Sequence, residues 1–279
     1  MIKQILVPTD GSENSFTAAD CAVSIARVCN AGICGLFVKD VKILAGPLMH
    51  DIGTSVGGMV PFGTFNQVIR EVLESQADVA LNQVEGKCAQ AKIPFCRQVL
   101  EGIVSREIVK SAESCDLIVM GKMGIHAKWQ DVFLGTTVEF VVRQTHKPVL
   151  IVPAGCGPFT KMLIAYDGSS FANKALQSGA DMASSLKLPV TVVCVSDKKE
   201  KAVEILAEAK NVLKNYQVTV TTIAKEGSDH ARGILEAGKE GFDILVMGAY
   251  GHSRLREMIL GSTTVSVMRA TTCPILLCR

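Results

Sequence analysis

The stretch Asp243-Ile244-Leu245-Val246-Met247-Gly248 decides the fold, because the chain contains nearly the same stretch earlier, as Asp116-Leu117-Ile118-Val119-Met120-Gly121. In both places an aspartate precedes a continuous run of apolar residues, and a glycine ends the run. A short run of this kind is typical of a parallel strand that is buried on both faces of its sheet. The repetition predicts that the 279-residue chain consists of two copies of one α/β unit.

Two further blocks recur in the same order on either side of this stretch. Ile5-Leu6-Val7-Pro8-Thr9-Asp10-Gly11-Ser12 matches Leu163-Ile164-Ala165-Tyr166-Asp167-Gly168-Ser169, and Lys147-Pro148-Val149-Leu150-Ile151-Val152 matches Cys273-Pro274-Ile275-Leu276-Leu277-Cys278. Between the copies lies Pro153-Ala154-Gly155-Cys156-Gly157-Pro158, which has the composition of a linker. Three blocks in one order, found twice, indicate a tandem repeat.

The linker predicts one domain at residues 1–154 and a second at 159–279. The first domain is longer because it carries an extra segment at about residues 41–65, which is rich in glycine, methionine and proline. This composition disfavours a core helix there. A flap over a ligand, an interface loop and a tolerated surface insertion are all open for this segment.

Strands and helices are expected to alternate along the second copy. Apolar and β-branched runs predict strands, and apolar spacing with capping residues predicts helices. The predicted strands are residues 162–165, 188–195, 218–223, 244–247 and 274–278. The first predicted helix is capped by Ser169 or Ser170 and runs through 177–186, and the others are 198–215, 230–239 and 262–270. Such alternation implies a parallel sheet covered by helices and joined by right-handed crossovers.

The composition bounds the class of protein. Apolar residues make up 48% of the chain and charged residues 20%, as in a globular protein, and the net charge of +2 predicts neither a nucleic-acid nor an anionic-membrane partner. No run of 18 apolar residues and no signal-peptide pattern is found, so a cytoplasmic location is expected.

The ten cysteines include no C-x-x-C pair, and most lie inside apolar runs. We expect them to be buried as small hydrophobic side chains and not to form a disulfide framework. Cys156 is the exception, because its place in the linker favours exposure.

The glycine-rich segment that follows residues 243–247 is the candidate ligand loop. Its pattern is G-x2-G-x9-G-S, with Gly248, Gly251 and Gly261 as the glycines. Glycines let backbone amides approach a phosphate closely, and the helix that opens after Gly261 would turn its N–H groups and positive end towards an anion. Further donors in this segment are His252, Arg254, Ser262, Thr263 and Thr264.

This spacing, placed after an Asp-Ile-Leu-Val strand, resembles the ATP-binding motif of the universal stress protein family. The Asp-Gly-Ser after each first strand and the Cys-Pro-Ile-Leu-Leu ending are similar to that family as well. The resemblance covers both copies, apart from the extra segment. It implies two Rossmann-like domains, each an open five-stranded parallel sheet of strand order 3-2-1-4-5 with helices on both faces.

The resemblance also implies where ATP, with or without Mg²⁺, would bind. Adenosine would lie against Ala165, Tyr166 and Asp167, with adenine on the backbone of Val195. Ribose and phosphates would lie on the glycine loop. The residues implied there are Met247, Gly248, Gly251, Gly261, Ser262 and Thr263.

The first copy departs from the motif. Ten residues, not nine, separate Gly124 from Gly135. The extra residue changes where the loop amides point, so phosphate binding by the first copy is left open. Its matching residues are Pro8, Thr9, Asp10, Val38, Met120, Gly121, Gly124, Gly135, Thr136 and Thr137.

Three functions are open from the sequence. The first is an ATP-binding stress-response or regulatory protein with slow hydrolysis at most. The second is an ATP hydrolase or adenylyl-transferring enzyme, although the G-x-x-x-x-G-K-[ST] lysine is absent. The third is a nucleotide-free interaction module. No metal-ligand spacing is found. The resemblance implies that the two domains pair through their last strands, within the chain or in a homodimer.

Overall fold

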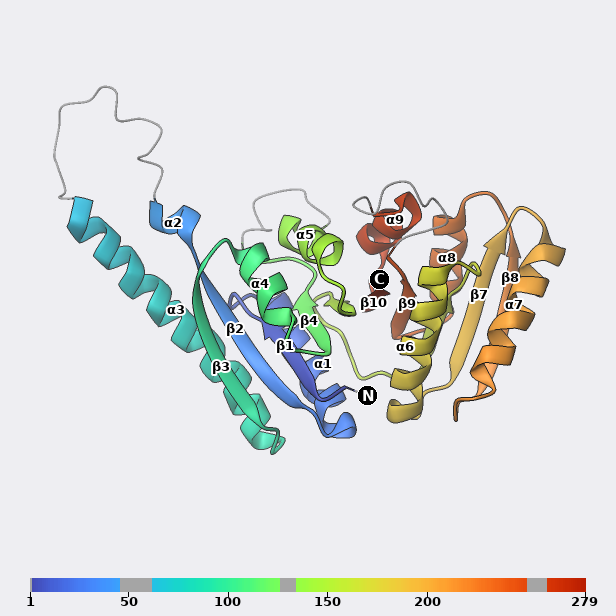
Figure 1. Cartoon of the computed structure of the whole chain (residues 1–279), viewed down its shortest axis with the longest axis horizontal. Coiled ribbons are helices and arrows are strands. Elements are labelled where there is room, and N and C mark those ends of the chain that lie inside the picture. Colours follow the sequence, from blue (N-terminus) through green and yellow to red (C-terminus); the bar gives the residue numbers. More distant parts are fainter. Residues whose placement is uncertain (1, 46–61, 126–133, 250–259) are drawn as a thin grey trace, which may run out of the picture.

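The computed structural model describes residues 2–45, 62–125, 134–249 and 260–279. Within these residues, ten strands form one sheet in the order β3-β2-β1-β4-β5-β10-β9-β6-β7-β8 (Figure 1). Each repeat contributes five parallel strands in the predicted order 3-2-1-4-5, which confirms the fold class. We call β1 to β5 with their helices the first repeat, and β6 to β10 with their helices the second repeat.

The elements of the second repeat agree closely with those expected from the sequence. The predicted helix 262–270 has the same bounds in the structure, and Ser169 caps the helix that follows the first strand. The elements are β6 (Met162–Ala165), α6 (Ser170–Leu186), β7 (Val190–Ser196), α7 (Lys199–Leu213), β8 (Val220–Glu226), α8 (His230–Gly238), β9 (Ile244–Gly248), α9 (Ser262–Ala270) and β10 (Ile275–Cys278).

The first repeat follows the same plan with one change. Residues 41–45 form a short helix and the next helix begins at Phe62, so the expectation of no helix in segment 41–65 is wrong at both ends. The rest of that segment lies outside the described residues. The elements are β1 (Gln4–Pro8), α1 (Glu13–Cys29), β2 (Gly32–Asp40), α2 (Val41–Ala45), α3 (Phe62–Gln90), β3 (Phe95–Gly102), α4 (Val104–Ala112), β4 (Leu117–Gly121), α5 (Thr136–Gln144) and β5 (Val149–Val152).

Two hydrophobic layers run across both repeats, one on each face of the sheet. One layer packs α1, α3, α6 and α7 against the strands, and the other packs α4, α5, α8 and α9. Strand residues such as Ile5 and Ile164 contribute to the first layer, and their neighbours Leu6 and Leu163 contribute to the second. The continuous apolar runs therefore exist because each central strand is covered on both faces. No helix among the described residues is both long enough and apolar enough to cross a membrane.

The two repeats join at β5 and β10, which pair antiparallel through Ile151 and Ile275, Leu150 and Leu276, and Val149 and Leu277. Two basic side chains cross this seam to the carboxyl end of a helix in the other repeat. Lys122 Nζ donates to the carbonyl oxygens of Arg269 (2.9 Å) and Thr271 (2.8 Å), at the end of α9. Arg279 Nη1 donates to the carbonyl oxygen of Arg143 (2.8 Å), at the end of α5. Each cation meets the negative end of a helix dipole.

The long helix α3 contains a glycine that packs against nothing. A Cβ added at Gly86 would have no heavy atom within 4 Å. We expect Gly86→Ala to raise the free energy of unfolding by about 1 kcal/mol, because alanine loses less backbone entropy in a helix. Chemical denaturation followed by circular dichroism measures this change.

Gly179→Ala is the matched control. Its added Cβ would lie 2.9 Å from Ile164 Cδ1 and 3.2 Å from Val246 Cγ1, so it should lower stability. An increase for Gly179→Ala, or a decrease for Gly86→Ala, would contradict the packing of these two helices.

Candidate functional site

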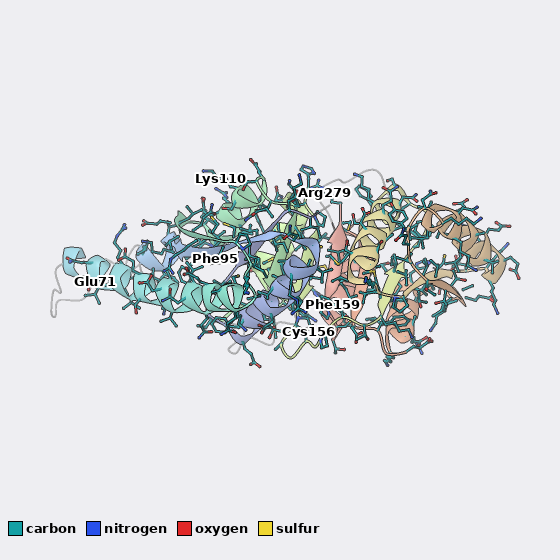
Figure 2. The ribbon with its side chains drawn as sticks, turned by 90° about the horizontal axis from the view of Figure 1, so that it is seen from below. Glu71, Phe95, Lys110, Cys156, Phe159 and Arg279 are labelled. Atoms are coloured by element: carbon teal, nitrogen blue, oxygen red, sulfur yellow. The ribbon has the colours of Figure 1, made fainter. Side chains whose placement is uncertain are left out.

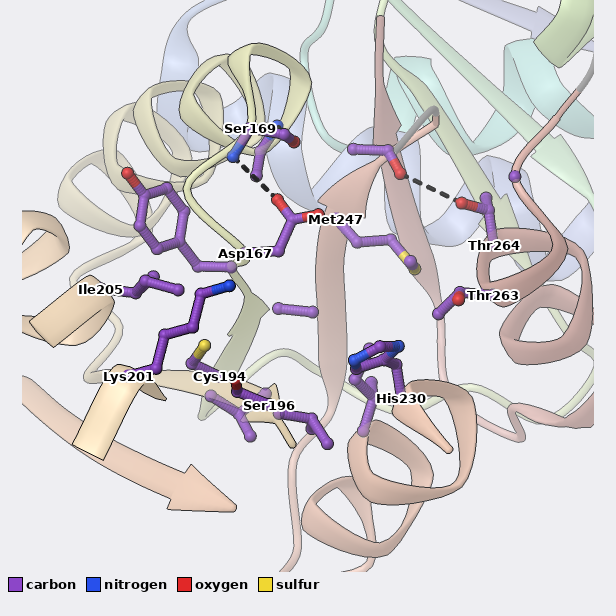
Figure 3. Close-up of a pocket in the computed structure, with 18 of the residues that line it drawn as sticks. Asp167, Ser169, Cys194, Ser196, Lys201, Ile205, His230, Met247, Thr263 and Thr264 are labelled. Atoms are coloured by element: carbon purple, nitrogen blue, oxygen red, sulfur yellow. Dashed lines mark hydrogen bonds between the residues drawn. The ribbon is translucent and has the colours of Figure 1, made fainter. Parts of the chain in front are cut away.

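A cavity of about 500 Å³ opens in the second repeat, at the carboxyl ends of β6, β7 and β9 (Figure 3). Strand β6 pairs with β7 on one side and with β9 on the other, so the strand order reverses here. Ligands of open parallel sheets bind at such a reversal, outside the carboxyl ends of the strands. The size lies in the usual range for small-molecule sites.

The structure brings together most of the residues that the sequence pointed to in the second repeat. Ten of them line this cavity: Ala165, Tyr166, Asp167, Val195, Met247, Gly248, Gly261, Ser262, Thr263 and Thr264. Gly251, His252 and Arg254 lie outside the described residues. The turn after β6 and the start of α9 thus face the same space.

The turn after β6 holds the Asp167 carboxylate at the mouth of the cavity. Asp167 Oδ1 accepts a hydrogen bond from the Ser169 backbone N–H at 2.9 Å, and Gly168 takes the positive φ of +79° that this turn requires. Ser169 Oγ in turn accepts from Ala172 N–H at 3.2 Å and caps α6. The aspartate is therefore oriented by the same turn that starts the helix.

The first turn of α9 forms the opposite wall. Its N-cap is Gly261, which offers no side-chain acceptor to the helix N–H groups. N–H groups at such an end suit an anion. Ser262 and Thr263 line the cavity beside them. Thr264 is also part of the lining, but its hydroxyl donates to the carbonyl oxygen of Gly248 (3.3 Å) and so ties α9 to the end of β9.

Gly248 is required for close packing as well as for the loop. A Cβ at this position would lie 2.9 Å from the carbonyl carbon of Phe171 and 3.0 Å from the backbone nitrogen of Ala172. The end of β9 therefore approaches the first turn of α6 within a distance that only glycine permits.

The floor of the cavity is apolar, with Ala165, Cys194 and Met247 among its residues. Burial raises the pKa of the Cys194 thiol to about 11, so this thiol stays protonated at neutral pH. Burial also raises the pKa of Tyr166, whose hydroxyl donates to Asn173 Oδ1 at 2.8 Å. An apolar floor with polar groups at the rim suits a flat heterocycle attached to a charged group.

Several lining residues were not found from the sequence. Lys201 extends from the first turn of α7 into the cavity, and His230 stands at the start of α8 near Thr263 (Figure 3). Both follow strand ends in the sequence, at the positions where a parallel sheet collects its ligand groups. Their position just after strand ends is the feature of the sequence that could have identified them as lining residues. Ser196 and Asp197, which end and follow β7, are two more lining residues that were not predicted.

In the equivalent region of the first repeat, the residues that directly follow β4 contact the Asp10 carboxylate. Asp10 Oδ1 accepts from Ser12 N–H at 3.0 Å, as Asp167 Oδ1 does from Ser169 N–H, and Asp10 Oδ2 accepts from Ile125 N–H at 2.8 Å. A Cβ added at Gly124 would lie only 2.7 Å from Asp10 Oδ2. The loop after β4 therefore lies directly on the carboxylate that would face a ligand.

Helix α3 narrows this region further. Phe37 stands on β2 where β7 has Cys194, and it packs against Ala77, Ala80 and Leu81 of α3. The matching glycines Gly11 and Gly168 face Ala80 of α3 and Ile205 of α7, respectively. By this correspondence Ala77 and Leu81 take the places of Ala202 and Leu206, and Gln76 takes that of Lys201. At these two positions the first repeat has Phe37 in place of the smaller Cys194, and an amide, Gln76, in place of the cation Lys201.

The other predicted residues of the first repeat lie in its core or at the ends of its strands and helices. Thr9 is buried with its hydroxyl 3.1 Å from Ser15 Oγ, and Gly135 N–H donates to the carbonyl oxygen of Lys122 at 3.2 Å. Met120 is buried, and Val38 packs against the same hydrophobic layer. Pro8 and Gly121 end β1 and β4, and Thr136 and Thr137 begin α5.

Comparison with known proteins matches the chain twice to the model of the Universal stress protein family, at residues 1–153 and 158–279. Universal stress protein Slr1230 of Synechocystis sp. is 28% identical over 288 residues, which cover 99% of each chain. Universal stress protein MJ0531 of Methanocaldococcus jannaschii is 32% identical over 154 residues, which cover 54% of this chain and 82% of that protein. A solved universal stress protein from Archaeoglobus fulgidus has a TM-score of 0.76 and 25% identity, and the match covers 99% of this chain and 98% of that one.

Proposed function

Because the chain belongs to the universal stress protein family and carries two copies of its domain, we propose that it is a regulatory stress protein whose second domain binds ATP. The observation that carries this proposal is the cavity at the strand-order reversal, which lies between the Asp167 turn and the uncapped start of α9. The G-x2-G-x9-G-S spacing supports the same ligand. We take the domains as residues 1–154 and 159–279.

In this proposal the two ends of the cavity receive different parts of the nucleotide. The base lies on the apolar floor, against Ala165, Val195 and Met247. The Asp167 carboxylate accepts a hydrogen bond from the nucleoside, and the phosphate oxygens accept hydrogen bonds from the backbone N–H groups at the start of α9. The apolar base thus lies against apolar side chains, and the charged phosphates lie at the positive end of α9.

We propose that the equivalent region of the first domain binds no nucleotide. Phe37, a larger side chain that packs against α3, stands where the second domain has Cys194, and Gln76 stands where it has Lys201. We therefore expect one nucleotide per chain.

We propose regulation, with hydrolysis slow or absent, as the role of the bound nucleotide. The sequence lacks the phosphate-loop lysine of the common nucleotide hydrolases. Pairing of the domains through β5 and β10 is proposed to hold the chain together in solution without a second copy.

Calorimetric titration of ATP with Mg²⁺ into nucleotide-stripped protein tests the proposal. Saturable binding at one site per chain is expected, with ADP, AMP and cyclic AMP titrated in parallel to define the phosphate requirement. Two sites per chain would contradict the proposal that the first domain binds no nucleotide. Absence of binding by a folded sample would overturn the ATP proposal, and sustained multiple-turnover hydrolysis would favour an enzyme.

A further inference from the structure

Two cysteines from distant parts of the chain lie side by side at the junction of the repeats. Cys21 is on α1, and Cys156 is in the linker between β5 and β6. Their Sγ atoms are 3.6 Å apart. Figure 2 shows Cys156 and Phe159 on the linker between the two halves of the molecule. This pair plays no part in the nucleotide cavity, which lies in the second repeat.

The surroundings of the two sulfur atoms differ. Cys21 is 5% exposed and belongs to the hydrophobic layer, whereas Cys156 is partly exposed and only packs against it. The prediction that the linker exposes Cys156 is therefore confirmed in part. An oxidant in solution meets Cys156 first, and Cys21 lies behind it.

The hydrogen bond between the thiols makes their reactivities unequal. Cys21 Sγ donates to Cys156 Sγ, which lowers the pKa of Cys156 despite the opposing effect of its burial. The same hydrogen bond, followed by burial, raises the pKa of Cys21. The accessible thiol is thus the one that ionises more readily, and the thiolate is the reactive form of cysteine.

We propose that Cys21 and Cys156 form a reversible disulfide when the protein meets hydrogen peroxide, and that this bond clamps the interdomain linker to α1. In the first step the Cys156 thiolate attacks a peroxide oxygen, giving a sulfenic acid and, after protonation, one water. The Cys21 sulfur then attacks the Cys156 sulfur, and the hydroxyl of the sulfenic acid leaves with the Cys21 proton as a second water. Two thiols lose two electrons in all, and one peroxide is reduced to two waters.

The linker has room for the movement that this bond requires. The sulfur atoms must approach from 3.6 Å to about 2.05 Å. Cys156 lies between Gly155 and Gly157, and a Cβ added at either glycine would meet no heavy atom within 4 Å. The backbone on both sides of Cys156 is therefore not packed, and α1 can stay in place.

Beyond Cys156 the linker is anchored to the second repeat. Asp243 Oδ2 accepts from the backbone N–H groups of Thr160 (2.8 Å) and Lys161 (3.0 Å). A Cys21–Cys156 bond would add an anchor on the first repeat. The oxidised linker would then be fixed at both ends.

A second cysteine pair serves as an internal comparison. Cys34 and Cys96 are direct neighbours in the register of β2 and β3. Both lie in strands whose backbone the parallel ladder holds in place, and burial raises the pKa of Cys34 to about 12. We expect this pair to stay reduced at the peroxide concentration that oxidises Cys21 and Cys156.

Peroxide treatment of the reduced full-length protein tests the proposal. We expect two thiols per chain to be lost and then restored by dithiothreitol. Non-reducing peptide mapping should identify the Cys21–Cys156 bond, and the thermal unfolding midpoint should rise on oxidation. Cys156→Ser should abolish the thiol loss and the rise, while the matched variant Cys96→Ser should keep both.

Three outcomes would overturn the proposal. One is a Cys34–Cys96 or Cys156–Cys273 bond in place of the expected one. Another is oxidation of Cys156 to the sulfinic acid while Cys21 stays reduced. The third is an unchanged unfolding midpoint in protein that carries the mapped bond, which would show that the bond does not hold the linker to α1. Cys156→Ser alters a partly exposed linker position, so the fold is expected to survive it.

Discussion

Asp167→Ala will weaken ATP binding by at least about 10-fold, because the variant loses a charge-assisted hydrogen bond to the nucleoside, worth about 1.5–3 kcal/mol. Asp167 stands at the mouth of the cavity and is oriented there by Ser169 N–H. Isothermal titration calorimetry with ATP and Mg²⁺ measures the change in affinity. This prediction rests on the proposed function.

The repeat supplies the control for this experiment. Asp10 has the same place in the first repeat and makes the same turn, accepting from Ser12 N–H at 3.0 Å. Asp10→Ala removes that turn and the bond to Ile125 N–H, so its stability should fall as well. ATP affinity should nevertheless stay unchanged in Asp10→Ala. Equal loss of affinity in the two variants would show that the effect comes from the fold and not from the site.

Lys122→Met will lower the free energy of unfolding by about 2 kcal/mol, because it leaves two carbonyl groups at the end of α9 without their donor. Lys122 is 8% exposed, and its ammonium donates to the carbonyl oxygens of Arg269 and Thr271 across the seam. Burial lowers the pKa of this lysine, so part of the gain from its hydrogen bonds is offset by desolvation. Methionine keeps the length and apolar volume of the side chain while removing the charge.

Chemical denaturation measures the effect, and Lys110→Met on α4 is the matched control. Lys110 is exposed, so its replacement should change stability by less than about 0.5 kcal/mol. If the two variants are equally stable, the Lys122 contacts contribute nothing to the joining of the repeats.

Local pattern was sufficient for much of the fold. The residues that cap α6 and the apolar run of β9 carry their own signals, so the elements of the second repeat are predicted within a few residues. The order of the strands came from the family resemblance, since no local pattern sets which strand lies beside which. The start of α3 at Phe62 was missed because the glycines just before it disfavour a helix.

The site was predicted only where it lies on the repeated blocks. Asp167 and Gly261 belong to motifs, whereas Lys201 and His230 enter the cavity from helices that the topology places around it. The contact between the residues after β4 and Asp10 was also not predicted from the sequence. The extra loop residue signalled a difference, but only the packing shows that Ile125 N–H meets Asp10.

Helix α9 contacts both repeats, the cavity of the second at its start and Lys122 of the first at its end. Its first residues line the cavity of the second repeat, and its last carbonyl groups accept hydrogen bonds from Lys122, which directly follows β4 of the first repeat. An α-helix of nine residues is about 13 Å long and behaves as a stiff rod. A displacement of Lys122 along this axis would therefore be transmitted through α9 to the wall of the cavity in the second repeat.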